Sequence, residues 1–353
     1  MSSDIYIIAA DKIVDGVGDS RETDGVRRAL QRSSFKTAEF DVAPLSLPWN
    51  ATLPPGCLRS ACSPLEAVLI FKELLSTNEA RAMILSGRDF IRSGYEKSRR
   101  NKFMEIYGEG ETPLTGYTKL APAFIESLGI SREEFRTVCG HIFENYLRTY
   151  RGLHPDAVPP ADTWFEPVTE FFRGVDCANP SVDFSGCAVF GNSEVADYFA
   201  VPASSRIRIT GCSLYKSGED GLDGIGDIIA YSHLEKAYDA ACEEAGIDFT
   251  KRFLAHEALL EVYTCYPIAP LAFLLKSRLV ADVSEIPEFL DSHEITITGG
   301  LNLSKAPWNN TTLSNLVTMV HRLRERTTPD LGGIHGNGSL GYQQGFMILE
   351  RQV

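Results

Sequence analysis

A glycine-rich stretch near the C-terminus combines residue types that could bind a ligand and move a proton. Residues 332–341 contain five glycines, with His335 and Asn337 between them. Glycine lets the backbone approach a ligand closely and turn its N–H groups into a cavity. A histidine can act as a general base near neutral pH. We therefore expect a loop in which Gly336, Asn337 and Gly338 donate hydrogen bonds to an anionic oxygen. His335 would be either the base or a loop histidine that only forms local hydrogen bonds.

A second candidate for chemistry is a cysteine at the start of a helix. Residues 65–75 are apolar on nearly every side, Pro64 suits the first helical turn and Ser63 suits the cap. A helix N-terminus lowers the pKa of a nearby thiol and favours the nucleophilic thiolate. Cys62 is therefore the candidate nucleophile, and Cys57 is a weaker one. The alternative for Cys62 is a buried cysteine that serves packing alone.

The rest of the chain supplies elements that could hold these residues at one place. The order of elements in the first half returns in the second, although the letters do not repeat. The pattern predicts strands at residues 4–10, 80–85, 206–212, 258–264, 294–298 and 345–349, and helices at 22–32, 65–75, 228–245, 268–279 and 310–324. This order predicts a duplicated α/β architecture. Two buried helices, starting near Cys62 and near Asn310, would point their N-termini at one site.

Three segments resemble the thiolase superfamily. Residues 295–351 are similar to its C-terminal end, with a GGL strand-turn, a buried helix and a Gly-rich hairpin. LEVYTCYPIA at 260–269 resembles the Tyr-Ser-Cys-Phe-Pro version of a motif in its divergent branch, which includes sterol-carrier-protein thiolase-like and acetyl-CoA acetyltransferase-like proteins. The helices from Tyr117 onward, with GISREE at 129–134, resemble the loop domain of the family.

This resemblance implies a fold and a division of the chain. The fold is an α/β, five-layer αβαβα structure of two pseudo-repeated βαβαβαββ halves with a helical loop region. Residues 1–100 would form a shortened N-terminal half, residues 101–203 the loop domain and the end of that half, and residues 204–353 the C-terminal half.

The resemblance also implies roles for single residues. The family's nucleophile motif matches residues 62–67, with one residue fewer between cysteine and leucine. If Leu65 and Ala67 keep the register, Ala61 takes the nucleophile position and Cys62 lies beside it. In the second motif, Tyr263 replaces the histidine or asparagine that orients a catalytic water, and Cys265 follows it.

The last two motifs depart from the family further. Its Gly-His-Pro falls on residues 305–307, Lys-Ala-Pro, so the activating histidine is absent from its usual place. Asn309 and Asn310 at the next helix could supply an amide instead, or could cap the helix. Its Cys-x-Gly meets residues 336–338, which leaves Gly336 at the cysteine position and Gly338 as a source of an oxyanion N–H.

Composition narrows the class of partner. The formal net charge of −13 argues against nucleic acid or an anionic membrane as the main partner. The N-terminal segment reads as a buried strand and not as a signal peptide, and no apolar run reaches membrane-spanning length. We therefore expect a cytoplasmic protein whose eight cysteines are reduced. The cysteine and histidine spacing predicts no metal site.

The leading functional hypothesis is an acyltransferase or carbon–carbon condensing enzyme that acts on acyl thioesters through an acyl-cysteine. Cys62 and His335 would carry the chemistry, and Asn310, Tyr263 and Cys265 would support it. Coenzyme A or phosphopantetheine would be part of the substrate, from acyl-CoA or an acyl carrier protein, and no separate cofactor is expected. One alternative is a catalytically degenerate protein that binds acyl-CoA or completes a heteromeric complex. Another is a retro-aldolase or hydrolase that uses Tyr263 or His335. The resemblance implies a homodimer.

Overall fold

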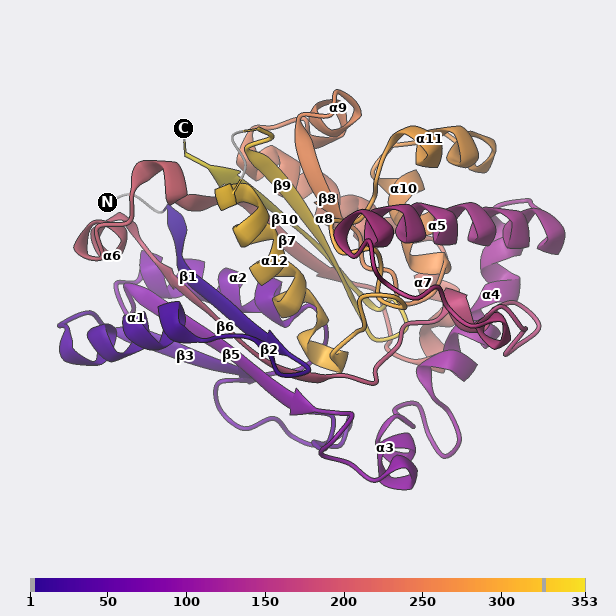
Figure 1. Cartoon of the computed structure of the whole chain (residues 1–353), viewed down its shortest axis with the longest axis horizontal. Coiled ribbons are helices and arrows are strands. Elements are labelled where there is room, and N and C mark those ends of the chain that lie inside the picture. Colours follow the sequence, from indigo (N-terminus) through magenta and orange to yellow (C-terminus); the bar gives the residue numbers. More distant parts are fainter. Residues whose placement is uncertain (1–3, 326–327, 353) are drawn as a thin grey trace.

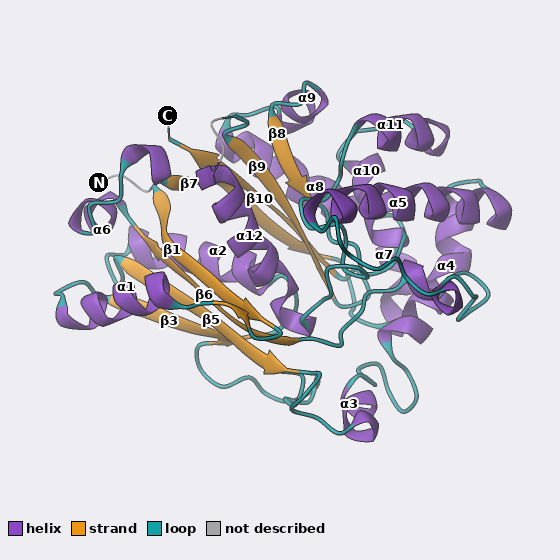
Figure 2. Cartoon of the chain, in the orientation of Figure 1, coloured by secondary structure: helices purple, strands orange, loops and turns teal. Residues whose placement is uncertain are grey.

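The computed structural model describes residues 4–325 and 328–352, which form one mixed sheet and surrounding helices (Figures 1 and 2). The strands are β1 (Ile5–Val14), β2 (Val17–Gly18), β3 (Thr37–Val42), β4 (Cys57–Leu58), β5 (Ala82–Phe90), β6 (Asp183–Gly191), β7 (Ile207–Lys216), β8 (Ala258–Glu261), β9 (Leu331–Gly338) and β10 (Gln343–Arg351). The helices are α1 (Arg21–Arg32), α2 (Ser63–Ser76), α3 (Lys97–Phe103), α4 (Pro113–Ser127), α5 (Arg132–Leu153), α6 (Ser193–Tyr198), α7 (Ile225–Ile228), α8 (Ser232–Ala245), α9 (Phe249–Leu254), α10 (Ile268–Lys276), α11 (Ile286–Ser292) and α12 (Thr311–Glu325).

The sheet has two parts that follow the order of the chain. Its strand order is β4-β3-β5-β6-β1-β7-β10-β9-β8, with β2 paired to β1. Strands up to residue 191 therefore lie on one side, and strands from residue 207 onward lie on the other. The two parts meet where residues 5–7 of β1 pair antiparallel with residues 207–209 of β7. This junction is short, whereas β1 pairs with β6 along nearly its whole length.

Helices α2 and α12 lie between the two parts of the sheet (Figure 1). Both contribute fully buried leucines, such as Leu65 of α2 and Leu316 of α12. These side chains belong to one apolar cluster with Ile7 of β1 and Ile334 of β9. Burying each such side chain contributes on the order of 1.5–3 kcal/mol. The central layer therefore holds the two parts of the sheet together although few backbone hydrogen bonds do.

Further helices cover the outer faces of the sheet. Strand side chains alternate between faces. Ile5 and Ile7 of β1 accordingly point at the central helices, whereas Tyr6 and Ile8 pack in a separate cluster with Leu30 of α1 and residues of α6. On the other part of the sheet, α8 and α10 cover β10 through a large apolar cluster that also reaches α4 and α5. The order helix, sheet, helix, sheet, helix confirms the predicted five-layer αβαβα fold.

Most predicted elements occur near their expected positions. The structure confirms helices at 22–32, 65–75 and 310–324 as α1, α2 and α12, and strands at 4–10 and 80–85 as β1 and β5. The predicted helix at 228–245 is divided: α7 ends at Ile228, and Tyr231, with a φ of 47°, caps the N-terminus of α8. Among the described residues, no helix is both long enough and apolar enough to span a bilayer.

The predicted glycine-rich loop is wrong in its form. Residues 331–338 are strand β9, buried along its whole length and paired with β10. The glycines allow other elements to approach the strand. A Cβ on Gly333 would lie 2.4 Å from Phe249 and 2.6 Å from Phe346, and a Cβ on Gly336 would lie 3.2 Å from the Cys62 sulfur. Close packing, and not a ligand-binding turn, explains glycine in this strand.

The predicted strand at 294–298 is absent because its backbone groups have a different partner. The buried carboxylate of Glu261 in β8 accepts hydrogen bonds from the N–H of Ile297, at 2.7 Å, and from the N–H of Thr298, at 3.1 Å. A side chain therefore satisfies donors that a neighbouring strand would otherwise satisfy. The apolar pattern is typical of a strand, but it does not reveal this carboxylate.

Candidate functional site

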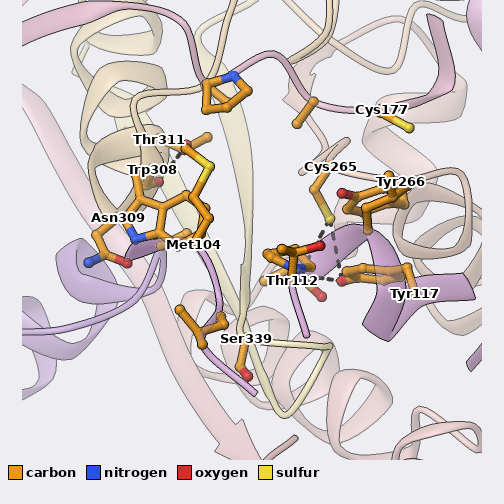
Figure 3. A pocket seen from close by; sticks show the side chains of 18 of the residues that line it. Met104, Thr112, Tyr117, Cys177, Cys265, Tyr266, Trp308, Asn309, Thr311 and Ser339 are labelled. Carbon is orange, nitrogen blue, oxygen red and sulfur yellow. Dashed lines mark hydrogen bonds between the residues drawn. The ribbon is translucent and has the colours of Figure 1, made fainter. Parts of the chain in front are cut away.

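A cavity of about 400 Å³ lies where α4, the β9–β10 turn and the residues before α12 meet (Figure 3). This volume is typical of a small-molecule pocket. Figure 3 shows Trp308, Asn309 and Met104 on one wall and Cys265, Tyr266 and Tyr117 on the other. The lining residues are Trp49, Ala61, Asn101, Met104, Glu105, Ile106, Tyr107, Thr112, Pro113, Leu114, Tyr117, Cys177, Ala178, Pro180, Tyr263, Cys265, Tyr266, Ala306, Trp308, Asn309, Thr311, Asn337 and Ser339.

The N-terminus of α2 reaches this cavity through Ala61 and not through Cys62. Ser60 has a φ of 102°, a strained value for a residue with a side chain, and it sharply turns the chain into the helix. The Ser60 hydroxyl accepts a hydrogen bond from the Cys62 N–H at 3.1 Å, which fixes the turn. Ala61 then lines the cavity, while Cys62 is fully buried against the β9–β10 pair.

The surroundings of Cys62 oppose its expected role as a nucleophile. Its sulfur lies 3.8 Å from the carbonyl oxygen of Gln343. Burial raises the pKa of this thiol well above its usual value, and the nearby Glu66 raises it further. A buried thiol whose pKa is raised fits the alternative interpretation, in which Cys62 serves packing alone.

His335 is also outside the cavity, and both of its ring nitrogens have partners. Nδ1 accepts a hydrogen bond from the N–H of Tyr263 at 3.4 Å, and Nε2 lies 2.8 Å from Oε1 of Gln344. The ring stacks on Phe273, with centroids 4.6 Å apart. Burial lowers the pKa of His335 to about 4. The expectation of a general base in the site is therefore not supported, because this imidazole lies outside the cavity and its low pKa makes it a weak base.

The two asparagines before α12 have different environments. Asn309 lines the cavity and donates from Nδ2 to the carbonyl oxygen of Ala43 at 2.9 Å. Asn310 is fully buried, and neither atom of its amide has a hydrogen-bond partner in the described part of the chain. It packs on Gly87 of β5, where a Cβ would lie 1.8 Å from its Oδ1. Of this pair, Asn309 alone reaches the site.

Of the expected oxyanion donors in the glycine-rich stretch, only Asn337 lines the cavity. Gly336 and Gly338 lie opposite Gly345 and Gln343 in the β9–β10 ladder, and neither lines the cavity. Asn337, between them, does line it. The strand alternation explains the difference, because neighbouring residues face opposite sides of the sheet.

Tyr263 and Cys265 do line the cavity, together with Tyr117, which the sequence does not single out as a site residue. The Cys265 sulfur lies 3.3 Å from the hydroxyl of Tyr117. Asn337 donates from Nδ2 to the same hydroxyl at 3.1 Å, and Gln344 donates from Nε2 to Asn337 Oδ1 at 2.5 Å. A chain of hydrogen bonds therefore links the cavity wall to the buried His335.

Burial keeps the polar groups of this wall protonated. It raises the pKa of Cys265 to about 12, and it raises the pKa values of Tyr117 and Tyr263 well above the usual value for tyrosine. Each group is thus neutral near pH 7. The wall can donate hydrogen bonds to an oxygen that gains negative charge, but it provides no thiolate.

The chain is similar to known proteins in structure but matches none by sequence among family models and curated proteins. Among solved structures, a monomeric SCP2-thiolase like protein from Mycobacterium smegmatis is similar over 99% of this chain and 78% of that chain, with a TM-score of 0.73 and 15% identity. An Ltp2-ChsH2(DUF35) aldolase is similar over 99% of this chain and 98% of that chain, with a TM-score of 0.68 and 12% identity.

A third neighbour comes from the thiolases themselves. The Acat5 thiolase from Ascaris suum in complex with coenzyme A is similar over 99% of this chain and 100% of that chain, with a TM-score of 0.60 and 13% identity. The chain has a divergent thiolase-like fold. The resemblance of the sequence motifs to this superfamily is thereby confirmed at the level of the fold.

The motif matches predicted which residues lie near the cavity better than they predicted the chemistry of those residues. Five residues from the matched segments line the cavity: Ala61, Tyr263, Cys265, Asn309 and Asn337. The matches did not indicate the hydrogen-bonding partners Tyr117 and Gln344 or the lining residue Trp308. A tyrosine in the first turns of an apolar helix carries no sequence signal for a site, because the same pattern describes an ordinary core residue.

The described residues also show no arrangement suited to a metal. No group of three histidine, cysteine, aspartate or glutamate side chains is placed to hold an ion. The cavity wall offers hydroxyl, thiol and amide groups for hydrogen bonding, and Glu105 adds one carboxylate.

Proposed function

We propose that this protein binds an acyl thioester in the cavity without forming an acyl-cysteine, and acts as a lyase on the carbon–carbon bond next to the thioester carbonyl. The observation that carries the proposal is that Ala61, and not Cys62, lines the cavity at the N-terminus of α2. Ala61 faces the cavity where the resemblance places a nucleophile, while the protonated Tyr117 hydroxyl and Cys265 thiol line the same cavity. The thiolase-like fold supports a thioester of coenzyme A or of a carrier protein as the ligand.

A retro-aldol cleavage is the reaction that fits these groups. A β-hydroxyacyl thioester gives its hydroxyl proton to solvent water, the electrons of the Cα–Cβ bond pass to the thioester, and the products are an aldehyde or ketone and the enolate of the shortened thioester. Solvent returns one proton to Cα of that enolate, so the protons balance and the reaction needs no oxidant or reductant. The negative charge develops on the thioester oxygen, where protonated donors in a partly closed, apolar cavity are most effective.

The test combines binding, adduct formation and product analysis. Trp308 and Trp49 line the cavity, so binding of a short β-hydroxyacyl-CoA should change the tryptophan fluorescence. Intact-mass measurement should show no covalent adduct, and chromatography should show cleavage to an aldehyde or ketone and a shorter acyl-CoA. A stable acyl adduct that disappears in Cys62→Ala would instead establish the acyl-cysteine mechanism and overturn this proposal.

One observation favours a second candidate, a protein that binds an acyl thioester without turning it over. Glu105 is the one carboxylate among the lining residues. It is held in an ion pair with Lys102 at 2.8 Å and accepts a hydrogen bond from the Gly110 N–H at 3.0 Å. A carboxylate held in this way is a weak base. Fluorescence changes without product, over a range of acyl-CoA substrates, would favour this second candidate.

A further inference from the structure

The hydrogen-bond chain behind the cavity wall has a fixed direction. His335 is neutral and carries one ring proton. Because its Nδ1 accepts from the backbone N–H of Tyr263, the proton must be on Nε2, which donates to Oε1 of Gln344. The assignment depends on a backbone N–H, which can only donate. The Gln344 side chain is therefore oriented with its oxygen toward His335.

This orientation continues through two amides. The Gln344 Nε2 group uses both hydrogens, one toward Asn337 Oδ1 at 2.5 Å and one toward the Gly341 carbonyl at 3.1 Å. Asn337 accepts through its oxygen, so its Nδ2 points at the cavity wall. There it donates to the Tyr117 hydroxyl at 3.1 Å and toward the Cys265 sulfur at 3.8 Å.

Tyr117 and Cys265, the pair on the cavity wall, therefore have two protons to donate but only one hydrogen bond between them. Tyr117 and Cys265 each carry one proton, and a single hydrogen bond of 3.3 Å joins their oxygen and sulfur. Whichever group donates in that contact, the other proton remains. Asn337 presents only donors to this pair, and the described part of the chain provides no acceptor for the remaining proton. Both groups line the cavity (Figure 3).

Tyr263 lines the same cavity but lies outside this chain of side-chain hydrogen bonds, and its backbone N–H donates to Nδ1 of His335. Thr311, also in the lining, donates its hydroxyl proton to the carbonyl oxygen of Trp308 at 2.8 Å. Stacking of Tyr266 on Tyr117, with centroids 4.4 Å apart, keeps the Tyr117 ring in place.

We propose that Tyr117, with Cys265 as its partner, is the hydrogen-bond donor that holds the thioester oxygen of the ligand, and that Gln344 and Asn337 are positioning residues that keep this donor directed into the cavity. The inference deepens the proposed function, on which it rests for the identity of the ligand. The donor requirement itself applies to any ligand whose carbonyl becomes an enolate.

The experiment measures enolisation of a bound ligand. Acetoacetyl-CoA forms an enolate that is read from its ultraviolet absorbance, and its apparent pKa should fall when it binds to the wild-type protein. One hydrogen bond to a charged oxygen corresponds to roughly a tenfold to a hundredfold change in the enolisation constant. Tyr117→Phe should remove most of this gain while the fluorescence-detected affinity for the neutral ligand changes little.

Two more variants separate the roles of the pair. Cys265→Ala should keep most of the gain, because the tyrosine proton is then free. Tyr117→Phe should keep a small remainder, because a thiol is a weak donor. Gln344→Met should lose part of the gain, because the Asn337 amide can then turn its oxygen to Tyr117. The matched control is Tyr231→Phe. The Tyr231 hydroxyl is buried outside the cavity and has no hydrogen-bond partner among the described residues, so its removal should leave enolisation unchanged.

A ligand without coenzyme A distinguishes failure of the inference from failure of the proposed function. Acetylacetone enolises similarly and is small enough for the cavity. If acetylacetone shows a Tyr117-dependent gain and acetoacetyl-CoA does not bind, the donor assignment stands and the thioester proposal falls. If either ligand enolises equally well in Tyr117→Phe, the donor assignment is overturned. If neither ligand binds, both proposals are overturned.

Discussion

At the scale of single residues, the site depends on which side chain the head of α2 directs into the cavity. Ala61 and Cys62 are neighbours, and the turn at Ser60 decides between them. The sequence left both assignments open, because a missing residue in the motif shifts the register by one position. In the structure, the methyl group of Ala61 lines the cavity and the thiol of Cys62 is buried in the core.

Thiol reactivity tests this arrangement directly. Ala61→Cys, made in a Cys62→Ala background, should react with iodoacetamide under native conditions, because its sulfur would face an accessible cavity. Cys62 of the wild-type protein should remain unmodified until the protein unfolds. Peptide mapping by mass spectrometry identifies the modified position among the other cysteines. Rapid native labelling of Cys62 would contradict the placement described above.

His335 predicts a contribution to stability that depends on pH. Its folded-state pKa of about 4 lies below the ordinary value of 6.5. Between these two pH values the histidine is protonated in the unfolded chain and neutral in the folded chain. The contribution is complete above pH 6.5 and is lost as the pH falls toward 4, and the loss reaches about 2 kcal/mol at pH 5.

The measurement is urea unfolding at pH 7 and pH 5. The wild-type protein should lose about 2 kcal/mol more than His335→Gln between these values. Comparing the two proteins removes the contribution of other titrating groups, among them Glu261, whose pKa burial raises to about 7. Equal losses in both proteins would show that His335 is not enclosed as a neutral group.

At the scale of elements, apolar periodicity predicted the buried helices well. The glycine content of residues 332–341 wrongly predicted a loop where the structure has strand β9. Residues 65–75 and 310–324 carry enough apolar positions to identify buried helices from the amino-acid sequence alone. The glycines of β9 predict a loop because glycine readily takes positive φ and lets the backbone approach a ligand. In the structure they allow Phe249, Phe346 and α2 to approach the strand. Packing partners distant in sequence decide this difference, so a local pattern could not reveal it.

A pair of glycine substitutions tests the packing role. Gly333→Ala places a methyl group 2.4 Å from Phe249 and should destabilise the fold by about 1–3 kcal/mol. Gly140→Ala, within α5, meets no atom within 4 Å and should stabilise the fold by roughly 0.5–1 kcal/mol, because alanine favours the helix. Chemical unfolding of both variants provides the comparison. A neutral Gly333→Ala would show that β9 does not need its close contacts.

At the scale of the whole molecule, the exposed edge of the sheet makes the oligomeric state testable. The edge strand β4 has two residues and pairs with residues 41–42 of β3. Residues 37–40 of β3 therefore keep a free edge, and the homodimer that the resemblance implies would use it.

We expect light scattering to give twice the mass of one chain. Glu39→Pro in β3 should then shift the protein to a monomer, because proline cannot join a ladder across the edge. The control is Val17→Lys in the exposed strand β2, which changes a surface residue away from this edge and should leave the mass unchanged. A wild-type monomer would contradict the expected dimer.

The short junction between β1 and β7 has a consequence for how the molecule folds. Since α2 also packs on β7 and α12 on β1 and β6, each central helix shields strands from the opposite part of the sequence. A fragment that ended before β7 would leave the inner face of its strands exposed to water, and so would the complementary fragment. The two portions of the polypeptide thus depend on one another to become native, and we expect them to melt in a single cooperative transition.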